Sequence, residues 1–116
     1  MNADVLKLWP ELEWIEDPDL REATARTWEL ALARSPLTPA DLERIPFTLL
    51  VPDCQVSFMA HKRLVVHLSR DAARQMNRFL QPDLTCDLDT VIAGAILADV
   101  GKLLEYDRDP AGETVK

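Results

Sequence analysis

Two polar residues in apolar surroundings are the positions at which this chain could do chemistry. His61 lies at helical spacing from four apolar residues and so shares their face of one helix: Leu64, Val65, Leu68 and Ala72. Asp99 follows the apolar run 91–98 and precedes Leu103 by four positions, so it falls on an apolar stripe of a second helix. We therefore expect both side chains to point toward the core, where an imidazole and a carboxylate could form a hard-metal or phosphate site.

Each of these residues also has a purely structural interpretation. His61 could be a core histidine whose ring nitrogens bond to neighbouring groups. An isolated buried carboxylate is costly unless it is paired, protonated or bound to a cation. Asp99 could therefore pair with Lys102, three residues later, or with an arginine of the preceding helix. Two ligands are few for a metal ion, so the spacing leaves both interpretations open.

A line of basic residues runs along the helix that carries His61. These residues recur at offsets that place them on one face: Arg63, His67, Arg70, Arg74 and Arg78. Guanidinium groups fit phosphate oxygens, so Arg63, Arg70 and Arg74 are candidates for binding a phosphate or another anion. The alternative is a solvated face that pairs with an acidic partner or with acidic residues of the first half: Glu11, Glu13, Glu16 and Asp17.

The segment 91–103, VIAGAILADVGKL, resembles the central motif of the HD-domain superfamily of metal-dependent phosphohydrolases. That motif is an apolar helix that ends in His-Asp and is followed by an aliphatic residue, Gly and Lys. The superfamily also has a metal-ligand histidine near the start of a preceding helix. His61 lies at the corresponding distance upstream and is followed by Ala72-Ala73, which is typical of that helix. The resemblance covers about residues 57–106.

The resemblance implies roles for three residues. His61 matches the first metal ligand, Asp99 matches the metal-binding aspartate of the doublet, and Lys102 matches a lysine near the phosphate. Asp99 and Lys102 would then be catalytic, and a divalent metal (Mn, Mg, Fe or Zn) would activate water for attack on a phosphoester. However, Ala98 replaces the doublet histidine, and the superfamily's last aspartate is not found before Lys116. We therefore expect a weak or absent metal site.

Prolines and capping residues indicate where the helices begin. Asp17-Pro18 and Thr38-Pro39 each combine an N-cap residue with proline at the first helical position. They predict one helix that stops before Ser35 and one short helical turn. A long helix is expected over 57–79, and Asp87 is expected to open a last helix that reaches about Tyr106.

These elements predict an all-α fold. We expect an HD-like bundle of about five helices that is incomplete at the C-terminus, in a single domain. Its parts are short helices and a connector or weak strand over 1–56, the motif-bearing helix pair over 57–106, and a polar tail over 107–116. Three tryptophans are expected as core or interface anchors: Trp9, Trp14 and Trp28.

Composition excludes several classes of protein. With 47% hydrophobic and 28% charged residues, the 116-residue chain can bury one core, which excludes wholesale disorder. The formal charge of −7 argues against broad nucleic-acid binding. The late apolar region has no uncharged run longer than the nine residues 90–98, and no secretory pattern is visible, so we expect neither a membrane span nor export. Cys54 and Cys86 are expected to be reduced thiols of a cytoplasmic protein.

Two functions remain as expectations. The first is a degenerate HD-domain protein of phosphohydrolase lineage, whose partner would be a phosphorylated small molecule such as a nucleotide. The second is a non-catalytic regulatory or protein-interaction module, which would use exposed apolar surface and the arginine line to form a homo-oligomer or to bind a partner protein.

Overall fold

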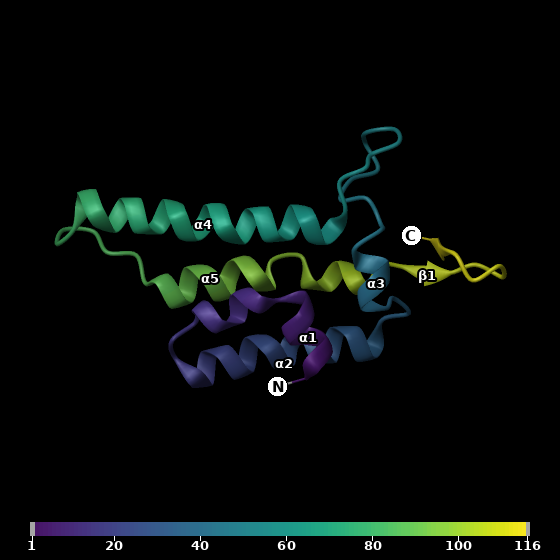
Figure 1. Ribbon diagram of the computed structural model, residues 1–116, viewed down its shortest axis with the longest axis horizontal. Helices are drawn as coiled ribbons and strands as arrows, with labels where there is room; N and C mark the ends of the chain where they lie inside the picture. Colours follow the sequence, from purple (N-terminus) through teal and green to yellow (C-terminus); the bar gives the residue numbers. More distant parts are fainter. Residues whose placement is uncertain (1, 116) are drawn as a thin grey trace.

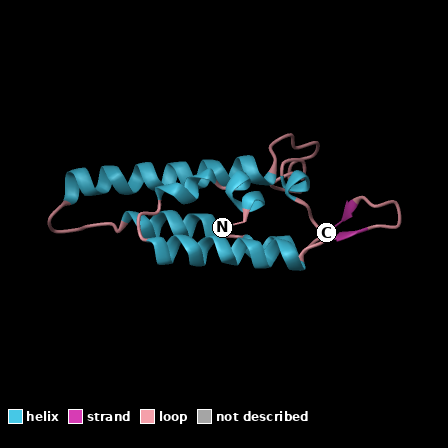
Figure 2. Cartoon of the chain, turned by 60° about the horizontal axis from the view of Figure 1, so that its bottom comes forward, coloured by secondary structure: helices cyan, strands magenta, loops and turns pink. Residues whose placement is uncertain are grey.

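A computed structural model describes residues 2–115 of the protein, and most of these residues are helical. The helical elements are α1 (Ala3–Leu8), η1 (Pro10–Trp14), α2 (Pro18–Arg34), α3 (Pro39–Leu42), α4 (Phe58–Leu80), α5 (Leu88–Leu97) and η2 (Val100–Leu104). Figures 1 and 2 show α4 along one side of the molecule and α2 along the other, and α5 contacts both. The predicted all-α class is confirmed. Within residues 2–115, no helix is both long and apolar enough to cross a bilayer.

Side-chain caps begin three of the helices where the sequence predicts them. The Asp17 carboxylate accepts the first free N–H groups of α2, and Thr38 forms a capping box with Asp41 at the start of α3. Ser57 Oγ accepts the N–H of Ala60 at 3.0 Å at the start of α4. These contacts are local, which explains why the helix starts are readable from the sequence.

Two tryptophans form the centre of the core. Trp9 and Trp28 are fully buried, and their rings meet edge to face with centroids 5.4 Å apart. Trp28 also donates from its indole nitrogen to the carbonyl of Ile96 at 2.9 Å, which ties α2 to α5. The predicted anchoring role of both residues is confirmed, whereas Trp14 is only half-buried.

The prediction of one helix from Asp87 to about Tyr106 is wrong. The α5 helix ends at Leu97, Ala98 turns to extended backbone, and Asp99 adopts a left-handed conformation with φ of 64°. The chain then resumes as the separate 3-10 helix η2. Asp99 is therefore exposed at a bend, and the expectation that it lies on a buried helical stripe is also wrong.

Tertiary hydrogen bonds account for this break. In a continuing helix the carbonyls of Ala95 and Ile96 would accept the backbone N–H groups four residues later. Instead, Ala95 accepts a bond of 3.2 Å from Lys62 Nζ, and Ile96 accepts the indole bond from Trp28. The last carbonyls of α5 are thus satisfied by side chains of α4 and α2, so the helix can end there without unpaired buried groups.

The α4 helix has two apolar faces, and the one predicted for the core is the outer one. The face against the rest of the protein consists of Phe58, Met59, Lys62, Val66 and Ala73. The outer apolar face, as we call it, consists of His61, Leu64, Val65, Leu68, Ala72, Met76 and Phe79. On it Leu68 is 58% exposed and Phe79 is 71% exposed. The prediction that His61 points into the core is therefore wrong.

The C-terminal segment forms a hairpin rather than only a polar tail. Strands β1 (Asp107–Arg108) and β2 (Thr114–Val115) pair antiparallel. The buried carboxylate of Asp41 holds this hairpin against α3 through an ion pair with Arg108, and it also pairs with Arg44 just after α3. Burial raises the pKa of Asp41, but the hydrogen bonds from Thr38 and the two guanidinium groups outweigh that effect and lower the pKa below its usual value.

Candidate functional site

The His61 side chain lies at the edge of the outer apolar face, not beside Asp99. Its ring stacks on Phe47 of the connector, with centroids 4.5 Å apart and an interplanar angle of 19°. The side chain is half-buried, and no hydrogen bond of the ring is present in the described part of the chain. His61 therefore anchors the connector to the start of α4.

The charged residue that faces Asp99 is Lys62, which the sequence analysis did not single out. Lys62 is 1% exposed, and its amine donates to the Ala95 carbonyl at 3.2 Å. Burial lowers the pKa of Lys62, and the nearby carboxylate of Asp99 partly opposes that shift. The spacing of Lys62 from Met59, Val66 and Ala73 is the sequence signal that would have identified it.

The two candidate metal ligands, His61 and Asp99, have different surroundings. The first side chain stacks on the connector, and the second lies within the field of a buried ammonium group. Residues 2–115 contain no cluster of three or more histidine, cysteine or acidic side chains suited to a metal ion. Lys102, the third residue implied by the resemblance, is half-buried on η2, where its charge acts on Tyr106.

Two members of the arginine line are paired with the N-terminal half. Arg63 donates to the Leu8 carbonyl at 3.0 Å and pairs with Glu43 at 2.8 Å. His67 bonds to Glu11 at 3.0 Å. For these two basic residues, the structure therefore agrees with the alternative interpretation, in which they pair with acidic residues of the first half.

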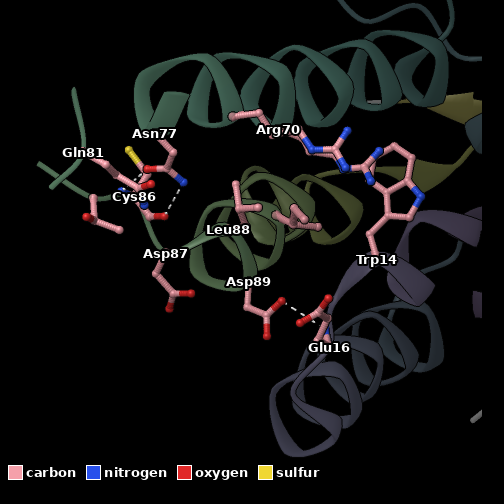
Figure 3. A pocket seen from close by; sticks show the side chains of 12 residues that line it. Trp14, Glu16, Arg70, Asn77, Gln81, Cys86, Asp87, Leu88 and Asp89 are labelled. Atoms are coloured by element: carbon pink, nitrogen blue, oxygen red, sulfur yellow. Dashed lines mark hydrogen bonds between the residues drawn. The ribbon is translucent and has the colours of Figure 1, made fainter. Parts of the chain in front are cut away.

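Arg70 and Arg74 lie together at an open pocket between α4, η1 and the start of α5 (Figure 3). The pocket has a volume of about 520 Å³. The Arg70 guanidinium lies 4.0 Å above the Trp14 ring, and Figure 3 shows the two side chains directed at each other. Arg74 has no hydrogen bond or ion pair with the described residues. Of the three arginines proposed to bind anions, the structure brings these two to one cavity.

Acidic groups on the same pocket are already used within the protein. Both oxygens of Asp89 accept backbone N–H groups, from Glu16 and Asp17, each at 2.9 Å. The Asp87 carboxylate accepts the Thr90 hydroxyl at 2.5 Å. These bonds hold both carboxylates in place without removing their charge. The guanidinium of Arg74 lies on the same pocket and has no hydrogen bond to the described residues.

A larger exposed feature is the apolar surface formed by the outer apolar face and the segments at either end of α4. Eleven of the thirteen exposed large apolar side chains among the described residues lie between positions 47 and 84. Those beyond the outer apolar face are Phe47, Leu49, Leu50, Val51, Val56, Leu80 and Leu84. Leu50, in the connector between α3 and α4, is 92% exposed. Sequence periodicity could place the α4 residues on one stripe but could not show that the stripe is uncovered.

The HD-domain resemblance is a prediction from a short motif and an upstream histidine. Of the two residues that carry it, His61 stacks on Phe47 and Asp99 lies exposed after the end of α5, and Ala98 stands where the motif has its histidine. Comparison with protein-family models, with curated proteins and with solved structures found no match for this chain.

Proposed function

We propose that this protein is a non-catalytic helical module of HD-domain lineage that works by binding another protein through the outer apolar face of α4. The observation that carries the proposal is the exposure of four large apolar side chains along that face, from Leu64 at 55% to Phe79 at 71%. When a partner covers water-exposed apolar side chains, the free energy of the system falls.

The size of the surface supports a protein partner. At roughly 80 Å² for each exposed large side chain, the eleven residues between 47 and 84 amount to on the order of 900 Å². The largest apolar patch of an ordinary monomer is about 300–600 Å². Each member of a stable protein complex contributes about 800 Å². The surface therefore has the size of a binding interface.

The shape of the molecule supports the same proposal. Its dimensions are 57 × 33 × 18 Å, and its radius of gyration is 15.8 Å, against about 13 Å for a compact domain of this length. A slab 18 Å thick is about two helix diameters deep. One side of α4 consequently has no layer of the described chain over it (Figure 1).

Binding is proposed in preference to hydrolysis because of the side chains around Asp99. Metal-dependent attack on a phosphoester would need His61 and Asp99 on one ion, and these two side chains have different neighbours. The carboxylate of Asp99 instead acts on the buried ammonium group of Lys62, which stabilises the end of α5 through its bond to Ala95.

Footprinting of the two internal methionines tests the proposed function. Met76 on the outer apolar face is 45% exposed, whereas Met59 on the core face is fully buried and serves as the internal control. Hydroxyl-radical oxidation would be compared between dilute purified protein and the same protein in an extract of its own cells. We expect Met76 to be oxidised in dilute solution and protected in the extract, with Met59 protected in both. Equal oxidation of Met76 in the two samples would refute the proposal.

A second candidate function rests on the pocket of Figure 3. Arg74 has no ion pair with residues 2–115 and lines the same pocket as the Arg70–Trp14 stack, so we propose that the cavity of about 520 Å³ accepts a phosphorylated small molecule. Titration with inorganic phosphate and with nucleotides, followed by calorimetry, tests this proposal. Arg74→Gln should weaken any binding at least about tenfold, while Arg26→Gln, an exposed change on α2, should not. Equal binding by the two variants would argue against the pocket.

A further inference from the structure

We infer that the partner of the outer apolar face is a second copy of this chain, bound antiparallel along α4 in a two-fold dimer. This inference rests on the proposed function, because it names the occupant of that surface. The face belongs to the longest helix, whose 23 residues span about 34 Å. A partner that covers it needs a helix of similar length, and in the described chain α4 itself is the one that presents an uncovered apolar side.

The spacing of the residues on this face is that of a helix-pairing seam. Uncharged side chains recur along α4 at intervals of four, three, four, four and three residues: His61, Val65, Leu68, Ala72, Met76 and Phe79. A 3-4 repeat of this kind is the pattern by which two helices interlock their side chains. A flat or irregular partner surface would not require it.

Antiparallel pairing places large side chains against small ones. With the two-fold axis between Leu68 and Ala72, each Leu68 faces Ala72 of the second copy, and each Leu64 faces Met76 of the second copy. Parallel pairing would instead oppose leucine to leucine and alanine to alanine, which leaves a gap at position 72. Antiparallel helix dipoles also attract each other, whereas parallel ones repel.

The segments at the two ends of α4 also match each other in the antiparallel dimer. The connector, with Leu49, Leu50 and Val51, projects beside the first turn of α4 (Figure 1). In the antiparallel dimer it lies against the last turn of α4 in the second copy, where Phe79 and Leu80 are exposed. The exposed apolar surface of roughly 900 Å² on each copy is then as large as the area that each partner of a stable dimer contributes.

Charge sets the conditions under which this dimer forms. Each copy carries a formal charge of −7, so the two copies repel each other at long range. The seam itself carries no permanently charged side chain, and added salt screens the repulsion while it leaves apolar burial intact. The dimer should therefore tighten as the salt concentration rises.

Sedimentation equilibrium of the full chain tests the inference between about 1 and 100 µM. We expect a monomer–dimer equilibrium, and Leu68→Glu should weaken it at least about 100-fold because two carboxylates enter the seam. Leu104→Glu is the matched control, since Leu104 is 54% exposed on η2, outside the surface, and it should leave the equilibrium unchanged. Circular dichroism of the variants checks that both keep their helices.

Disulfide trapping distinguishes the two orientations. In a background in which Cys54 and Cys86 are replaced by serine, one chain carries Leu64→Cys and another, larger by a tag, carries Met76→Cys. Oxidation of the mixture should give the mixed disulfide, and each chain oxidised alone should form no disulfide cross-link on a denaturing gel. Homodisulfides from each chain alone would overturn the antiparallel arrangement.

The outcomes separate this inference from the proposed function. A wild-type chain that stays monomeric to about 100 µM overturns the dimer. If Met76 is nevertheless protected in the extract, the surface binds a different protein and the proposed function stands. If Met76 is oxidised in the extract and the purified chain is monomeric, both proposals fail.

Discussion

Replacement of the buried lysine, Lys62→Met, should stabilise the protein at neutral pH. The ammonium group is 1% exposed and makes one hydrogen bond, at 3.2 Å to the Ala95 carbonyl. Two of its three N–H donors have no acceptor among the described residues. Methionine has a similar length and volume and brings no charge into the core, and such replacements are often neutral or stabilising.

The magnitude follows from the groups gained and lost. Relief of two unpaired buried donors should gain about 2–3 kcal/mol, and loss of the bond to Ala95 should cost about 1–2 kcal/mol. The net gain is about 1 kcal/mol in the free energy of unfolding, which raises the melting temperature by about 4 °C in a domain of this size. The exposed residue Lys7 on α1 supplies the control, since Lys7→Met should change stability by less than about 0.5 kcal/mol.

The effect should depend on pH with a defined sign. Burial lowers the pKa of Lys62 below the usual 10.5, so the native state releases this proton at a lower pH than the unfolded chain. Wild-type stability therefore rises with pH between the lowered pKa and 10.5, and the advantage of Lys62→Met shrinks over the same interval. Urea unfolding at neutral and alkaline pH measures both quantities. A loss of more than about 1 kcal/mol at neutral pH, or an advantage independent of pH, would refute the reasoning.

Two other substitutions test the contacts that hold the ends of the fold. Asp41→Asn should cost about 2 kcal/mol at neutral pH, because it removes the charge that pairs with Arg108 and Arg44. Since the pKa of Asp41 is lowered in the native state, its contribution is present above the ordinary value of 3.8 and is lost as the pH falls through the lowered pKa, so the variant and wild type should converge in acid urea titrations. Trp28→Phe removes the buried bond of 2.9 Å to Ile96 and should cost about 2 kcal/mol by calorimetry, and an unchanged melting temperature would contradict the account given for the end of α5.

Local chemistry in the sequence determined where the helices start. Asp17, Thr38 and Ser57 each accept N–H groups two or three residues later, and proline follows the first two at the first helical position. Such contacts need no other part of the chain, so helix starts and the all-α class could be predicted. The same holds for the shared faces along α4, because helical periodicity alone assigns residues to a face.

Only the tertiary structure decided which face of α4 is buried and where α5 ends. Two stripes of α4 are apolar enough to meet a partner, and the one with Lys62 was selected because its amine reaches the carbonyl at the end of α5. The sequence around Asp99 predicts a continuous helix. In the folded protein, Lys62 and Trp28 donate to the carbonyls of Ala95 and Ile96, and the helix ends there. These choices depend on donors 33 and 68 residues away in the chain, and a periodic pattern carries no information about such distant partners. The burial predicted for His61 and Asp99 was wrong for this reason, and the exposed seam on α4 became visible only in the folded chain.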